Sequence, residues 1–195
     1  TIVNVGLLVL ASRDNSYTGG TVVNNGGALQ VSSDANLGAS TGGLTINGGV
    51  LYTTDTMSTS RDVTLGGGGI FANDANEALT LNGTVSGTGG VKQLGQGTLV
   101  LNGDNTYTGG TSIGSQGTVQ VGDDANLGDA SGGIQIDNGT LHTTGDIDST
   151  RNIDVTAMGG NIVTDAGTTF ATGGGVSGSG QINKGGAGTL QIDGN

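Results

Sequence analysis

Short segments that alternate apolar and polar residues run along the chain, separated by glycines or Asn-Gly pairs. Alternation with a period of two, rich in β-branched residues and bounded by glycine, is typical of β-strands. In the first half of the chain it predicts strands over residues 21–24, 28–31, 44–47, 50–53, 63–65 and 70–72. The second strand of each pair centres on Leu29, Leu51 or Phe71. The chain therefore has a structural period of about 20–23 residues.

Two architectures fit this period: a solenoid of stacked coils and a meander of hairpins. A long meander needs closure, a second sheet or capped edges, and it would bring more aromatic core residues than this chain has. In a solenoid each coil places similar residues above similar residues, which explains the period directly. We therefore predict an all-β solenoid of roughly nine coils, about 40 Å long at about 4.8 Å between strands.

The chain also repeats itself on a longer scale. Residues 14–63 are identical to residues 104–153 at 23 of 50 positions, and both stretches contain Tyr-Thr-Gly-Gly-Thr and Asp-Ala-Asn-Leu-Gly. One inserted residue then moves the offset from 90 to 91. We interpret residues 1–195 as one continuous solenoid: unit one (residues 7–97), unit two (residues 98–188) and the start of a third unit (residues 189–195). Both termini cut through repeats, so we expect a piece of a longer protein.

Differences between the two units separate core positions from surface positions. Val23 of unit one corresponds to Ile113 of unit two, and both residues are apolar, as expected for side chains that face a core. Chemically distinctive groups change freely where Tyr52 becomes His142 and Ser58 becomes Asp148, as expected for a solvated face.

Composition excludes several classes of protein. Glycine provides 43 of 195 residues without a three-residue period, and proline is absent, which excludes collagen. Cysteine is absent, so no disulfide, thiolate zinc site or iron–sulfur cluster can form. Regularly spaced apolar residues make up 32% of the chain, which argues against disorder. The absence of proline suits uninterrupted parallel strand pairing.

The formal net charge of −11 limits the partners of the chain. A chain with five Lys and Arg residues lacks the cations that neutralise phosphates, so we expect no nucleic acid partner. The longest apolar run, residues 2–11, is interrupted and too short to cross a bilayer, so we expect no direct membrane insertion. Weak binding of divalent cations at the surface is a better expectation than a dedicated site.

Residues 97–111, Gly-Thr-Leu-Val-Leu-Asn-Gly-Asp-Asn-Thr-Tyr-Thr-Gly-Gly-Thr, resemble the autotransporter-associated β-strand repeat of Gram-negative type V secreted proteins. The resemblance continues through residues 117–121 to residues 124–128, and a second copy runs from residue 7. The first copy departs from the pattern in two places: it has one extra residue within 10–13, and Gly27-Ala28-Leu29 replaces Gly-Thr-Leu. Neither departure affects the predicted fold.

This resemblance implies a right-handed parallel β-helix at the bacterial cell surface or secreted from the cell. It also implies an outer-membrane β-barrel translocator elsewhere in the parent chain. Cell aggregation or biofilm formation is the implied biological outcome.

Several carboxylates are candidate glycosidase residues, because parallel β-helices also host polysaccharide-degrading enzymes and two carboxyls must face one substrate. Asp123 and Asp124 are adjacent, so they could pair only in a turn. Asp146 and Asp148 could share a face, but Thr56 and Ser58 hold the equivalent places in unit one. Asp62 is a further candidate.

Arg61 and Arg151 precede strands at equivalent places and could hold a carboxylate, or form corner salt bridges and bonds to loop carbonyls. His142 is the only histidine and has no serine or aspartate at catalytic spacing, so we expect a surface residue. Tyr17 and Tyr107 are expected to pack over a corner while glycines turn the chain.

Two further motifs bear on calcium binding and ice binding. Residues 159–165 only distantly resemble the glycine-rich nonapeptide of calcium β-rolls. The pairs Thr53-Thr54 and Thr143-Thr144 return only after 90 residues, whereas an ice-binding array would need threonine in every coil.

We therefore expect a non-enzymatic, rod-like adhesive segment with no cofactor and no catalytic or metal-binding residues. Its polar ladders would support self-association or bind a glycan or protein ligand at the cell surface. The alternatives are a β-helix polysaccharide-degrading enzyme and a passive spacer stalk. The ligand-binding residues are not identified by the sequence.

Overall fold

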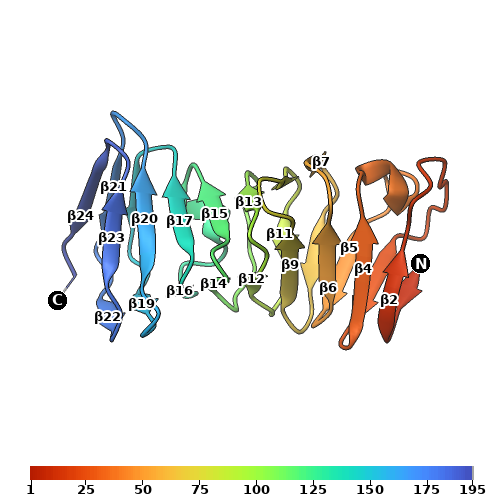
Figure 1. The fold of residues 1–195 in the computed structure, drawn as a ribbon, viewed down its shortest axis with the longest axis horizontal. Coiled ribbons are helices and arrows are strands. Elements are labelled where there is room, and N and C mark those ends of the chain that lie inside the picture. Colours follow the sequence, from red (N-terminus) through yellow and green to blue (C-terminus); the bar gives the residue numbers. More distant parts are fainter. Residues whose placement is uncertain (195) are drawn as a thin grey trace.

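A computed structural model describes residues 1–194 and shows a rod of stacked parallel strands (Figure 1). Its only helical segments in this range are two single 3-10 turns, η1 (Asp34–Leu37) and η2 (Asp124–Leu127). The predicted all-β solenoid of about nine coils is confirmed.

Each coil has three sides, which we call faces A, B and C. Face A holds β1 (Ile2–Val3), β3 (Thr21–Asn24), β5 (Leu44–Asn47), β8 (Val63–Leu65) and β11 (Val85–Ser86), and then β18 (Ile147–Ser149), β21 (Thr169–Thr172) and β24 (Thr189–Ile192). Between β11 and β18 this face is continued by the loop around Tyr107 and by η2, because Thr106 N donates to Val85 O and Asp129 N to Tyr107 O.

Faces B and C are longer continuous sheets. Face B holds β2 (Gly6–Val9), β4 (Gly27–Val31), β6 (Val50–Thr53), β9 (Gly69–Asn73), β12 (Val91–Gln93), β14 (Thr111–Gly114), β16 (Ile134–Asp137), β19 (Ile153–Val155) and β22 (Val176–Gly178). Face C holds β7 (Met57–Thr59), β10 (Ala78–Leu81), β13 (Thr98–Leu101), β15 (Thr118–Val121), β17 (Thr140–Thr143), β20 (Gly160–Thr164) and β23 (Ile182–Gly185).

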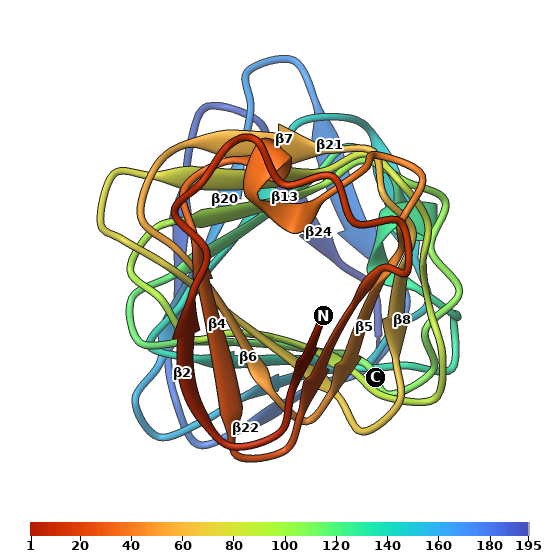
Figure 2. The ribbon, with the colours of Figure 1, turned by 90° about the vertical axis from the view of Figure 1, so that its right-hand side faces the viewer.

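The coil is right-handed, as the family resemblance implied. Figure 2 looks along the rod from its N-terminal end, and there the chain passes up through β2 and β4, across the top, and down through β5 and β8. A chain that turns clockwise as it recedes from the viewer is a right-handed coil. This is the strongly preferred hand for crossovers between parallel strands.

A narrow apolar core runs along the axis because alternate residues of every strand point inward. Leu29, Leu51 and Phe71 stack in register across β4, β6 and β9, and all three are buried. The strands predicted at residues 21–24, 44–47, 50–53 and 63–65 are confirmed, and those at 28–31 and 70–72 are slightly longer than predicted. Each inward residue therefore packs against equivalents in the coils on either side, and a single coil would leave that apolar surface exposed.

Equivalent residues of the two units do not lie on the same face, which was not predicted from the sequence. Val23 pairs with Ile46 on face A, whereas its equivalent Ile113 pairs with Gln93 and Ile136 on face B. Likewise β4 lies on face B and its equivalent β15 on face C. Each unit contains thirteen strand or turn segments, counting its 3-10 turn (η1 or η2) and its tyrosine loop (around Tyr17 or Tyr107), and a coil uses three. Each unit therefore advances by four coils and a third, and unit two is rotated by a third of a turn about the rod.

Candidate functional site

A network of polar contacts surrounds Tyr107 at a corner of the rod. The Tyr107 ring is fully buried, and its hydroxyl lies 2.6 Å from Thr111 Oγ1. Gly128 packs directly against it, with a φ of +81°, and a Cβ there would come within 2.9 Å of the ring and 2.5 Å of the Tyr107 carbonyl. Only glycine fits this position, so the tyrosine and glycine motifs form one structural unit.

The 3-10 turn η2 is closed by a capping box. The Asp123 carboxylate accepts from Ala125 N at 2.9 Å, and Asn126 Oδ1 accepts from Asp123 N at 3.0 Å. Asn126 also donates from Nδ2 to the Gly103 carbonyl at 3.1 Å, which ties the turn to the coil below. The Asp123 carboxylate therefore serves as the N-cap of the turn and is occupied by that hydrogen bond.

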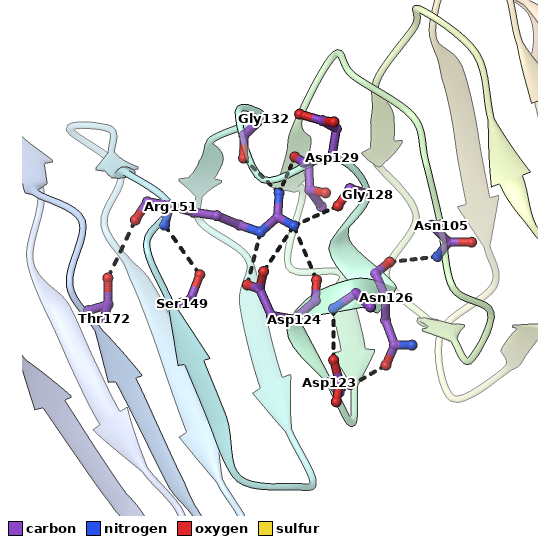
Figure 3. A network of polar contacts seen from close by, with 12 residues as sticks. Asn105, Asp123, Asp124, Asn126, Gly128, Asp129, Gly132, Ser149, Arg151 and Thr172 are labelled. Carbon is purple, nitrogen blue, oxygen red and sulfur yellow. Dashed lines mark hydrogen bonds and ion pairs between the residues drawn. The ribbon is translucent and has the colours of Figure 1, made fainter.

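Arg151 fastens this turn from the coil above (Figure 3). Its Nε donates to Asp124 Oδ1 at 3.0 Å, and its two terminal nitrogens reach the carbonyls of Gly128, Asp129 and Gly132 at 2.7, 2.5 and 3.0 Å. Nη2 also donates to the Asp124 carbonyl at 3.1 Å. Every nitrogen of the Arg151 guanidinium therefore donates a hydrogen bond within the protein, and the Arg151 side chain is only 1% exposed.

Arg61 repeats this arrangement in unit one, with Asp34 Oδ1 at 2.7 Å and the carbonyls of Ala39, Gly42 and Gly38 within 2.8 Å. The expectation of a corner salt bridge with bonds to loop carbonyls is confirmed for both arginines. The structure thus brings Asp123, Asp124 and Arg151 together as a structural corner. No acid–base pair across a cleft results.

The other candidate carboxylates lie apart. Asp62 accepts from Thr84 N at 3.1 Å and Asp146 from Thr169 N at 2.8 Å, so both join neighbouring coils. Asp148 is exposed on β18. Two carboxyls facing one substrate, as glycoside hydrolysis requires, are not found among these candidates.

His142 lies on the outer side of β17 on face C, in agreement with the expected surface position. Its Nε2 is 2.8 Å from Asp165 Oδ1 in the next coil, and both side chains are partly exposed. The calcium candidate at residues 159–165 consists mostly of strand β20, and its Asp165 is engaged by this histidine. Within residues 1–194 no group of three His, Asp or Glu side chains is placed to hold a metal ion.

The threonine pairs do not form a surface array either. Thr53 and Thr143 point inward and are fully buried, whereas their neighbours Thr54 and Thr144 point outward at the corner. Threonines do stack elsewhere: Thr98, Thr118 and Thr140 face outward in three consecutive coils on face C. This ladder was not predicted from the sequence because its members lie 20 and 22 residues apart and only the coil register aligns them.

Outward polar ladders continue on other parts of the rod. Asn24 Nδ2 donates to Asn4 Oδ1 at 2.7 Å, and Asn47 Nδ2 donates to Asn24 Oδ1 at 2.9 Å, along the corner between faces A and B. The same corner farther along holds a shallow groove of about 580 Å³ floored by glycines, with Lys92, Gln135 and Asp154 on its wall. These ladders and this groove lie on the outer surface of the rod.

The buried tyrosine makes stability sensitive to alkaline pH. Burial raises the pKa of Tyr107 to about 12 from 10. Because the folded pKa lies above the unfolded one, the stability contributed by neutral Tyr107 is complete below pH 10 and falls by about 3 kcal/mol as the pH rises toward 12. We expect Tyr107→Phe to remove this part of the decline in unfolding free energy between pH 10 and 12. Denaturant titrations monitored by circular dichroism would measure it, and Tyr17→Phe, at the half-buried equivalent, should keep the decline.

No helix in the described part of the chain is long and apolar enough to cross a membrane. The family model of the passenger-associated transport repeat matches residues 5–31 and 91–121. The first stretch contains Tyr17 and the second contains Tyr107. Over 153 residues the chain is 38% identical to an adhesin of Brucella suis biovar 1 (strain 1330), the BmaC autotransporter. That alignment covers 78% of this chain and 4% of the adhesin.

No solved structure matches the chain. The repeat match, the similarity to a passenger protein and the parallel solenoid agree with one another, and they agree with the resemblance carried by the tyrosine motif. The chain belongs to the repeat-containing passengers of autotransporters, which lie outside the cell, at its surface or released from it.

Proposed function

We propose that the chain is an adhesive rod: a non-enzymatic segment that presents polar side chains at regular intervals along the passenger, each able to make a weak contact with a partner. The observation that carries this proposal is the stacking of outward side chains in coil register, as in Thr98, Thr118 and Thr140. Identical groups at about 4.8 Å intervals can engage a repetitive partner, a glycan or another surface protein, through multivalent binding.

The comparison with known proteins supports this proposal at the level of the class. The similar Brucella protein is named an adhesin, and the chain spans only 4% of its length, so its activity is extended to this chain as part of the proposal. The carboxylates already assigned to caps, corner bridges and coil-to-coil bonds support a non-enzymatic role. The parent chain would supply the outer-membrane β-barrel translocator.

A deletion of one repeat unit separates an adhesive array from a passive spacer. We propose residues 7–97 and 98–188 as the repeating units, so removal of residues 98–188 joins Gly97 to Thr189. Because β24 begins as β13 does, the deletion preserves strand register. In the parent passenger displayed on cells, we expect adhesion to fall at equal surface expression. Adhesion equal to that of the intact passenger would contradict the proposal, as would release of oligosaccharides from host or bacterial polysaccharides incubated with it.

A further inference from the structure

The groove at the corner between faces A and B lies in the middle of the rod, where Figure 1 shows β12 and β14. Its floor consists of the residues that precede five successive strands of face B: Gly68, Gly90, Gly110, Gly133 and Asn152. Four coil steps of about 4.8 Å make it about 19 Å long. Packing requires the glycines, because a Cβ on Gly90 or Gly110 would come within 2.5 or 2.7 Å of a carbonyl oxygen in the next coil. The glycines therefore keep the groove open, and evidence for a ligand has to come from its wall.

One wall of the groove is a row of polar side chains on the outer side of face B. Lys92, Ser112, Gln135 and Asp154 stack in register across β12, β14, β16 and β19, and we call these four residues the polar row. Ser112 Oγ donates to Gln135 Oε1, and Gln135 Nε2 donates to Asp154 Oδ2, both at 3.4 Å. Within residues 1–194 Lys92 has no ion-pair partner. These contacts orient the row and leave it with donors and acceptors for a ligand.

The fold does not require the polar row, because unit one builds the same groove with other side chains. Gly20, Thr21 and Gly43 line a groove of about 350 Å³ and are the equivalents of Gly110, Thr111 and Gly133. The outward residues at the places of the polar row are Ile2, Val22, Thr45 and Thr64. The backbone thus forms this groove with either set of side chains, so the charged and amide groups of the polar row are available for binding.

The chemistry of the polar row favours a ligand with many hydroxyl groups. Lys92 only donates hydrogen bonds and Asp154 only accepts them, whereas a hydroxyl does both and fits every place along the row. The strands β12, β14 and β16 are each paired on both sides, so an extended peptide finds no open strand edge here. The net charge of −11, together with Asp154, disfavours a polyanion. Leu94 lines the groove and is 41% exposed, which offers an apolar surface to the C–H face of a sugar ring.

We propose that the groove of unit two binds a neutral glycan, an extended hexose chain that lies along the rod with its hydroxyls on the polar row. This inference rests on the proposed adhesive role and names the class of partner for that role. The row spans three coil steps, about 14 Å. A β-1,4-linked hexose chain repeats at a similar distance to the coils, so successive sugars meet successive side chains of the row. The groove is shallow, so we expect weak binding that repetition along a passenger would strengthen.

Exchange of the polar row for its counterparts in unit one tests this proposal. The row variant is Lys92→Ile, Ser112→Val, Gln135→Thr and Asp154→Thr, side chains that unit one already folds with. We expect cellohexaose, a neutral β-1,4-linked glucose hexamer, to shift the NMR amide signals of the groove floor and the polar row of the parent chain in a saturable way. The row variant should keep the circular dichroism and unfolding midpoint of the parent, and its dissociation constant for cellohexaose should rise at least about tenfold.

Two controls locate and identify the contact. Gln120→Thr removes a glutamine from the outer side of face C, away from the groove, and should leave cellohexaose binding unchanged. A β-1,4-linked glucuronic acid hexamer has the same backbone linkage but a carboxylate on every sugar, so it should bind more weakly than cellohexaose. The proposal is overturned if millimolar cellohexaose gives no saturable shifts, if the row variant binds it as well as the parent does, or if the glucuronic acid hexamer binds equally well.

Binding of chain-coated beads to cells tests the adhesive role separately from the groove. We expect beads coated with the parent chain to bind cells and beads coated with the row variant to bind fewer. Equal binding by both overturns the groove as the adhesive contact and leaves the adhesive role standing. Parent-coated beads that do not bind cells, although the parent chain binds cellohexaose, remove the adhesive role and leave the glycan site.

Discussion

Leu51→Asp is expected to unfold the central coils, with a loss of at least about 4 kcal/mol of unfolding free energy. Leu51 is 1% exposed and stacks between Leu29 and Phe71 in the axial core. Removing a buried leucine side chain costs about 2–5 kcal/mol. A carboxylate in its place has no hydrogen-bond donor within an apolar column, which adds a further desolvation cost. A solenoid transmits this loss to neighbouring coils because each buries its apolar side against the next.

Denaturant unfolding followed by circular dichroism measures the effect as a shift of the midpoint. Val50→Asp is the matched control, since it introduces the same carboxylate one residue away on the outer side of the same strand. We expect the control to lower the midpoint far less. Equal midpoints for Leu51→Asp and the parent would mean that the Leu51 side chain does not face the core.

Strand positions and core residues were predictable because period-two alternation reports directly which side chains face inward. The same pattern puts Leu29, Leu51 and Phe71 at the centres of successive strands, and the strand pairing stacks all three in one column. The third strand of the coil was missed at β7 because Thr59, which faces inward beside Met57, is polar, so the segment shows no apolar alternation. The 3-10 turns were missed because their signal is a capping box inside a stretch of small polar residues.

The surface was less predictable than the core. A ladder such as Thr98, Thr118 and Thr140 exists only through coil register, and register depends on insertions that vary from one coil to the next. The rotation of unit two by a third of a turn has the same origin, because a sequence repeat need not contain a whole number of coils. Sequence comparison of the units aligns Tyr52 with His142, but only the structure shows that they face different directions.

Arg151→Met is expected to have the second large effect, a loss of about 3–5 kcal/mol. The guanidinium is buried and satisfies the Asp124 carboxylate together with four carbonyls, of Asp124, Gly128, Asp129 and Gly132. Methionine fills part of the volume but donates no hydrogen bond, so these acceptors lose their partners at the corner. Removing one side of a buried charged network is costly for this reason.

Arg151→Lys should recover only part of the loss, because one ammonium group cannot reach a carboxylate and the surrounding carbonyls in the planar geometry of a guanidinium. Hydrogen exchange should show faster exchange in residues 123–133 of Arg151→Met while residues 33–43, held by Arg61, remain protected. The reverse pattern is expected for Arg61→Met. If residues 123–133 stay protected in Arg151→Met, the corner is held by the Asp123 cap and the Tyr107 packing alone, and the arginine is dispensable. In each variant the corner of the unmutated unit serves as an internal control, because its own arginine is intact.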